Sequence, residues 1–185
     1  MSLRIQPAVP PFDPEVAEVI DRTMKGRPPL RLFSTLARDP RLCKKFFAGG
    51  LLDRGNLTLR QREIVIDRTT ARCRSEYEWG VHVALFSKAA GLTEEQIDST
   101  ATGSAADACW SVEDRLLIQL CDSLHDECRV ADELWSELRT LFSENALIEI
   151  LMLAGFYRTV SYLTNAMELP LEDVGIRFPS YQTMR

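Results

Sequence analysis

The strongest constraint on the fold is a series of helix-start signatures that recurs along the chain. Each has a Ser, Thr or Asp that can accept a hydrogen bond from the first helical turn, followed by residues suited to that turn. Asp13-Pro14 and Asp39-Pro40 place proline directly after the cap, and Thr93-Glu94-Glu95-Gln96 is a capping box. Apolar residues follow these signatures at helical spacing, and no stretch of useful length alternates as a strand would. The pattern predicts an all-α fold.

The expected helices follow from these caps and from the glycines and prolines that end them. A helix that begins at Pro40 and runs through Leu51 should end at Gly55. The other expected helices span residues 15–25, 30–38, 59–72, 75–90, 94–102, 112–124, 132–142 and 144–167. Four prolines between Pro7 and Pro14 predict an extended arm before the first helix. We expect one helical domain at 30–172, preceded by the arm and first helix at 1–29 and followed by a tail at 173–185.

Composition excludes several classes of protein. At 185 residues and 45% hydrophobic content the chain can bury one sizeable core. The net charge is −5 and basic residues form no cluster, which argues against nucleic-acid binding. The five cysteines form no Cys-x-x-Cys and the N-terminus resembles no signal peptide, so we expect a cytoplasmic protein with free thiols. The apolar stretch from Ala146 to Tyr157 is shorter than the ~20 residues needed to cross a bilayer and predicts a core helix, with no membrane partner.

Ionisable residues lie on helical faces that otherwise look buried. Glu63 shares a face of its helix with Leu59 and Ile66. On the next helix Ser75, Glu78 and His82 stand at positions i, i+3 and i+7, which form one stripe. Trp79 and Phe86 flank that stripe. A hydroxyl, a carboxylate and an imidazole would therefore point together into an apolar wall.

If the two helices form an antiparallel hairpin, Glu63 can approach His82 in a partly dry site, where burial and a charged neighbour tune both groups for proton transfer. Structural roles compete with this interpretation. A lone histidine on such a helix is often a hydrogen-bonded core residue, and a buried glutamate usually closes an ion pair, here with Arg62, Arg68 or Arg72. Ser75 is equally explained as an N-cap with Glu78 completing a capping box, while Tyr77 and Trp79 suit packing.

The same residues carry a family resemblance. The sequence contains Leu59-x-x-Arg62-Glu63, then Arg72-Cys73-Arg74-Ser75-Glu76-Tyr77-Glu78-Trp79, then His82 and Ala90-Gly91-Leu92. This pattern resembles the carboxymuconolactone decarboxylase superfamily, which includes the alkylhydroperoxidase D proteins. The resemblance extends over roughly residues 30 to 172. It implies a single-domain, all-α helical bundle of the alkylhydroperoxidase D-like type.

The resemblance also implies roles for individual residues. The alkylhydroperoxidase motif has a Glu, a Cys-x-x-Cys and a His, and the matching positions here are Glu63, Ser75, Glu78 and His82, with Tyr77 between the two cysteine positions. Without those sulfurs the intramolecular disulfide cycle is impossible. The dithiol-free pattern resembles the decarboxylase side, where cofactor-free enzymes open or decarboxylate a lactone acid.

We therefore expect a cofactor-independent lyase or isomerase for a small acidic substrate, with His82 as the proton donor or acceptor. Glu63 would orient His82, and Tyr77, Ser75 or Glu78 would assist. The residues expected to hold the substrate are Trp79, Arg72 and Arg74.

Two alternatives remain open on the sequence alone. One is a peroxidase-like oxidoreductase that uses Cys73 or none of the motif positions. The other is a non-catalytic helical oligomer that binds a small molecule. No metal is expected, because Glu63, Glu78 and His82 lack a second His or a Cys at ligand spacing. By resemblance we expect a homo-oligomer, whether dimer, trimer or hexamer.

Overall fold

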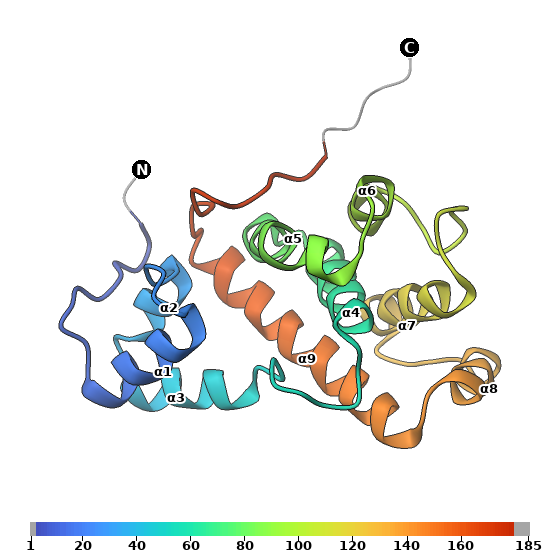
Figure 1. Cartoon of the computed structure of the whole chain (residues 1–185), viewed down its shortest axis with the longest axis horizontal. Coiled ribbons are helices and arrows are strands. Elements are labelled where there is room, and N and C mark those ends of the chain that lie inside the picture. Colours follow the sequence, from blue (N-terminus) through green and yellow to red (C-terminus); the bar gives the residue numbers. More distant parts are fainter. Residues whose placement is uncertain (1–2, 180–185) are drawn as a thin grey trace, which may run out of the picture.

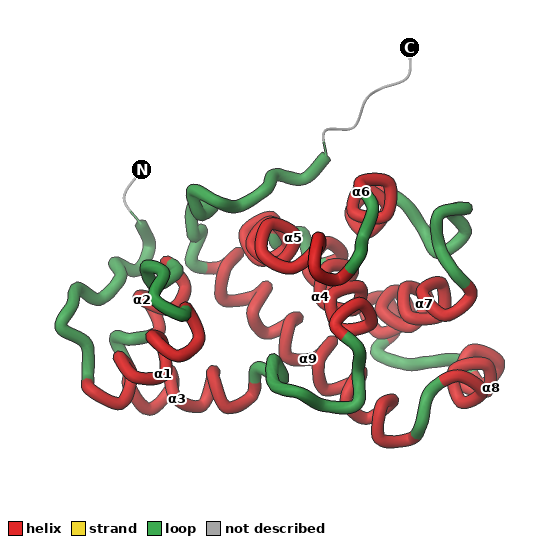
Figure 2. The backbone as a smooth tube through the Cα atoms, viewed as in Figure 1, coloured by secondary structure: helices red, strands yellow, loops and turns green. Residues whose placement is uncertain are grey.

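A computed structural model describes residues 3–179, and within that range the chain forms nine helices and no strand (Figures 1 and 2). The all-α prediction is confirmed. Side chains of the expected caps Asp13, Thr58, Thr93, Ser111 and Ser143 accept hydrogen bonds from their first turns. The helices are α1 (Pro14–Met24), α2 (Arg31–Leu36), α3 (Pro40–Gly49), α4 (Leu59–Arg72), α5 (Glu76–Ala90), α6 (Glu94–Thr102), α7 (Val112–Glu127), α8 (Asp132–Leu141) and α9 (Glu144–Ala166).

The third helix ends earlier than the sequence predicts, at Gly49 instead of Gly55. Two consecutive glycines weaken the helix at this point, and Leu51 has a φ of 49°, outside the right-handed helical region. The loop that follows is held by α9, because the Asn56 backbone N–H donates to the Glu149 carboxylate at 2.7 Å. Where the last turns of α3 were expected, the chain forms a loop that the Glu149 side chain of α9 holds in place.

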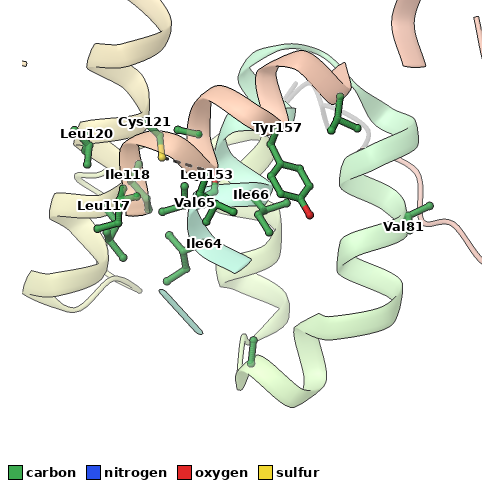
Figure 3. Close-up of a cluster of buried hydrophobic side chains, with 14 of the residues drawn as sticks. Ile64, Val65, Ile66, Val81, Leu117, Ile118, Leu120, Cys121, Leu153 and Tyr157 are labelled. Carbon is green, nitrogen blue, oxygen red and sulfur yellow. Dashed lines mark hydrogen bonds between the residues drawn. The ribbon is translucent and has the colours of Figure 1, made fainter. Parts of the chain in front are cut away.

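α4 lies at the centre of the bundle, between α5, α7 and α9 (Figure 1). The consecutive residues Ile64, Val65 and Ile66 are all completely buried. Three successive residues point in different directions around a helix, so burial of all three means that α4 is covered on every side. Figure 3 shows this cluster, with Leu117 of α7 and Leu153 of α9 closing around it.

A ladder of ion pairs joins α4 to α7. Arg60 pairs with Asp114 at 2.9 Å, Arg68 with Asp122 at 2.7 Å and Arg72 with Asp126 at 2.6 Å. Partners in each pair are 54 residues apart, so the two helices run parallel in a fixed register. The middle pair is the most buried, and the Arg68 guanidinium also donates to three backbone carbonyl groups at the end of α6.

α9 is the longest helix and meets the length and apolarity expected of a membrane-crossing helix. A core helix meets the same criteria, and one side of α9 packs into the bundle through Leu147, Ile150 and Leu153. The opposite side carries Ile148 and Met152, which are exposed. The predicted core position of this apolar stretch is confirmed for the inward side.

The segment after α9 returns across α5 (Figure 1). The Ile176 N–H donates to the Gly80 carbonyl at 3.1 Å, and a Cβ on Gly80 would lie 2.1 Å from the Ile176 carbonyl oxygen. Only glycine therefore permits this approach of two backbones. The Phe178 ring packs against Trp79 with ring centroids 5.0 Å apart. Residues 168–179 are thus an integral cover of α5.

Candidate active site

His82 of α5 lies between two glutamates. Its Nδ1 is 2.7 Å from Oε2 of Glu63, which α4 presents from the facing side. Its Nε2 is 3.4 Å from Oε1 of Glu78, one turn earlier on α5. The predicted approach of Glu63 to His82 is confirmed. The first contact is a short, charge-assisted hydrogen bond, whereas the second is longer than an ordinary hydrogen bond and leaves Nε2 less committed.

The three groups are almost completely buried, with exposed fractions of 0% for Glu63, 4% for His82 and 7% for Glu78. Burial by itself would lower the pKa of His82, but the charge of Glu63, the hydrogen bond to Glu63 and the nearby Glu78 carboxylate outweigh it and raise the pKa to about 10. His82 is therefore an imidazolium at neutral pH. Arg62 completes the charge pairing, because its Nε donates to Oε1 of Glu63 at 3.0 Å.

An apolar cavity of about 140 Å³ opens beside His82 and Glu78. Glu63 stands behind the imidazole and does not line it. The His82 ring is 5.0 Å from the Tyr157 ring, edge to face, and 5.2 Å from the Phe86 ring. Further walls come from α1, α2, α3, α5 and α9, through Met24, Leu30, Phe33, Phe46, Phe47, Val81, Leu85 and Phe156. Two ionisable groups thus stand at one side of a small, largely aromatic chamber.

Two residues of this region were not identified from the sequence. Asp67 lies one turn after Glu63 on α4 and is completely buried, and neither of its carboxylate oxygens has a hydrogen-bond partner among residues 3–179. Burial, with the nearby Glu63 charge, raises its pKa well above the ordinary value. Burial likewise raises the pKa of Tyr157. The i, i+4 spacing from Glu63 was the available signal for Asp67, whereas Tyr157 was identified only as the end of an apolar stretch.

Three residues expected at the site have other positions. Ser75 caps α5, accepting from the Glu78 N–H, and its hydroxyl is 2.8 Å from that of Thr164. The Tyr77 hydroxyl donates to Glu172 in the segment after α9. Trp79 donates from Nε1 to the Thr100 hydroxyl at 2.9 Å.

None of the three lines the cavity beside His82, so the packing interpretation fits them. The capping box expected at Ser75 forms only in part, since the Glu78 side chain turns towards His82.

Arg72 and Arg74 do not accompany His82 either. They line a separate, open hollow of about 770 Å³ beside Glu76 and Phe178, and Arg72 is held by Asp126 of the ladder. The arginine in the wall of the His82 cavity is Arg27, an exposed residue in the turn after α1. Of the residues predicted for the site, the structure therefore brings together Glu63, Glu78 and His82. Among residues 3–179, no group of three metal-binding side chains is suitably placed for a metal ion.

Comparisons with known proteins agree with this architecture. Residues 41–120 match the model of the carboxymuconolactone decarboxylase family. A peroxidase-related protein from Ralstonia eutropha JMP134, described as an alkylhydroperoxidase AhpD core, shares the fold with a TM-score of 0.73, at 19% identity over 88% of this chain and 87% of its own. A peroxidase-related protein from Silicibacter sp. TM1040 gives 0.76, at 14% identity over 89% and 88%.

The debrominase Bmp8, in complex with 2,3,4-tribromopyrrole, gives a TM-score of 0.76 at 15% identity over 94% of both chains. No curated protein matches the sequence. The structural matches establish the shared fold. The segment that matches the family model, residues 41–120, contains Glu63, Glu78 and His82.

Proposed function

We propose that the chain is a cofactor-independent enzyme of the carboxymuconolactone decarboxylase and alkylhydroperoxidase D-like type, which transfers a proton to or from a small, lactone-like acid. The observation that carries the proposal is the arrangement of His82, fixed at Nδ1 by Glu63 and presenting Nε2 and Glu78 to an apolar cavity. Positioned acid–base groups in a dry pocket are the arrangement that proton transfer at carbon requires.

In a decarboxylation, the bond between the substrate and its carboxylate breaks, and the electron pair stays on the substrate as an enolate. The imidazolium of His82 stabilises that charge and donates its Nε2 proton to the carbanion. Glu63 keeps the ring oriented throughout, as its short bond to Nδ1 holds the other nitrogen. Glu78 is placed to return a proton to Nε2 for the next turnover. In an isomerisation, Glu78 would instead remove the proton that His82 replaces.

Cavity chemistry supports a small ring-shaped substrate with one acidic group. Aromatic walls favour a flat molecule, and the debrominase of the same fold holds a small planar ring, 2,3,4-tribromopyrrole. A carboxylate is repelled by Glu78 and attracted by Arg27, so it would point towards the arginine side of the cavity. Arg27 thereby takes the anchoring role that the sequence suggested for Arg72 or Arg74.

The test is a panel of five- and six-membered lactone carboxylic acids, incubated in deuterium oxide and followed by NMR. We expect one member to incorporate deuterium at the carbon that loses carbon dioxide or shifts its double bond. His82→Gln keeps a hydrogen-bonding side chain but cannot exchange a proton near neutral pH, so turnover should fall by about 10² to 10⁴-fold while circular dichroism stays unchanged.

Arg27→Ala, compared with Arg74→Ala as its matched control, separates the two arginine assignments. Only the former should raise KM. Turnover that survives in folded His82→Gln protein would refute the mechanism. Binding of panel members without any turnover would instead identify the chain as a small-molecule binding protein.

A further inference from the structure

A second hollow, separate from the His82 cavity, collects three of the five cysteines. It has a volume of about 200 Å³ and lies between the C-terminal halves of α4 and α7 and the middle of α9. Cys73, Cys121 and Cys128 line it together with His125 and Arg158. In Figure 3, Cys121 and the cavity residue Tyr157 lie on opposite sides of the apolar cluster. The thiols are therefore outside the chemistry proposed for His82.

Cys73 has a histidine beside it. Its sulfur lies 3.9 Å from Nδ1 of His125, a contact suited to a weak S–H···N hydrogen bond. Burial, with the positive charges of Arg72 and Arg158, lowers the pKa of His125, so the imidazole is neutral and able to accept a proton. Burial raises the pKa of the Cys73 thiol, which is therefore protonated at rest. A neighbouring base is what such a thiol needs in order to react.

Of the two other thiols that line the hollow, Cys128 is better placed than Cys121 to react with Cys73. Cys121 is almost fully buried, and its sulfur donates to the Val65 carbonyl at 3.8 Å. Cys128 follows the last residue of α7 and is exposed. Since α4 and α7 run parallel with a 54-residue offset, position 73 lies level with the end of α7, where residue 128 stands. Cys73 and Cys128 consequently line the same hollow from neighbouring helix ends.

We propose that Cys73, His125 and Cys128 form a thiol–disulfide exchange site for small disulfides that carry negative charge. His125 takes the proton from Cys73 as its sulfur attacks the disulfide RSSR, which gives a mixed disulfide and releases RS⁻. Cys128, which is exposed, then loses its proton to solvent and attacks the Cys73 sulfur, which closes an intrachain disulfide and releases the second RS⁻. The protein loses two electrons and two protons, and the small disulfide is reduced to two thiols.

Arg158 accounts for the preference for anions. Its Nε donates to the Tyr162 hydroxyl at 2.8 Å, and its Nη1 donates to the carbonyl groups of Leu124 and His125 at 3.4 and 3.3 Å. These bonds hold the guanidinium at the hollow without neutralising it, as none of the three partners is a carboxylate. A fixed positive charge beside the reacting sulfurs attracts an anionic disulfide and stabilises the departing thiolate.

Sequence analysis names Cys73 in one alternative but no partner thiol for it, because Cys73 and Cys128 are far apart in the chain. The parallel register of α4 and α7 supplies the partner that sequence distance concealed.

The experiment uses the intact reduced protein and the dianionic disulfide dithiobis-nitrobenzoate. Glu-specific proteolysis separates Cys73, Cys109 and Cys128 into different peptides for mass spectrometry, since Glu63, Glu76 and Glu127 bound them. We expect Cys73 to react at least ten-fold faster than Cys109, a half-buried cysteine outside the hollow, and a Cys73–Cys128 disulfide to follow. Cys128→Ser should trap the nitrobenzoate on Cys73.

His125→Gln should slow labelling of Cys73 about ten-fold and leave labelling of Cys109 unchanged. Replacing the probe by a neutral dipyridyl disulfide should remove most of the preference for Cys73 over Cys109. Labelling of Cys73 no faster than Cys109, or no link between Cys73 and Cys128, would overturn the proposal. Neither result bears on the His82 mechanism, which is measured by lactone turnover.

Discussion

α4 carries buried charge on two of its faces, and the two faces handle that charge differently. Towards α7, three arginines meet three aspartates, and Arg72 contacts both Asp126 and Asp122. Towards α5 and α9, Glu63 pairs with Arg62 and His82, Glu78 lies beside His82, and Asp67 has no ion-pair partner among residues 3–179. The first face has a balanced set of charges and fixes the register of the helices. The second keeps an excess of acidic groups in a dry place, which is unfavourable for folding and suited to proton transfer.

The largest effect should come from breaking the balanced face at its most buried point. Arg68→Met retains an apolar stem of similar length but removes the bidentate partner of Asp122 and the hydrogen bonds that the guanidinium donates to three backbone carbonyl groups. We expect the free energy of unfolding to fall by about 3 to 5 kcal/mol, measured by urea denaturation. A loss below about 1 kcal/mol would mean that the ladder contributes little to stability.

The neighbouring residue should behave in the opposite way. Asp67→Asn replaces a buried, protonated carboxyl by a neutral amide of the same shape, so the free energy of unfolding at pH 7 should rise by about 1 kcal/mol or more. Because the folded-state pKa of Asp67 is raised, wild-type stability suffers as pH rises above the unfolded value near 3.8. The advantage of the variant should therefore disappear near pH 4. A destabilised variant at pH 7 would show that the ionised carboxylate is bound by an unrecognised partner.

The smallest effect is expected at the exposed end of the ladder. Asp126 is 55% exposed in its side chain, so solvent screens its pair with Arg72. Asp126→Asn should change the free energy of unfolding by less than about 1 kcal/mol. A double-mutant cycle with Arg72→Gln isolates the pair from other contacts of either residue. A coupling energy as large as the loss expected for Arg68→Met would show that burial does not determine how much each ion pair of the ladder contributes to stability.

Sequence patterns predicted the helices well because caps are local. Thr58, Ser75 and Gly91 mark the bounds of α4 and α5, and the facing stripes of these helices placed Glu63 beside His82. The end of α3 was misplaced because Glu149, distant in sequence, holds the loop that replaces its last turns. Local signals carry no information about such partners.

The residues that line the His82 cavity could not be predicted from the sequence for a related reason. Met24, Phe47 and Phe156 come from three different helices and meet only through tertiary packing. Arg72 seemed close to the motif along the chain, but its position on α4 directs it to α7. Periodicity identifies the face on which a residue lies, and it leaves open which neighbour that face will meet.

The spacing of the ladder has a consequence for folding fidelity. Its arginines are eight and then four residues apart, and its aspartates repeat the same unequal intervals. If α7 slid by one turn in one direction, Asp122 would lie level with Arg72, Asp126 would lie beyond the end of α4, and Asp114 would face Ile64. In the other direction Asp126 would reach Arg68, but Asp122 would then lie against Ile64. With this uneven spacing, only one register of α7 on α4 pairs all three arginines with all three aspartates. The same register brings His125 to Cys73.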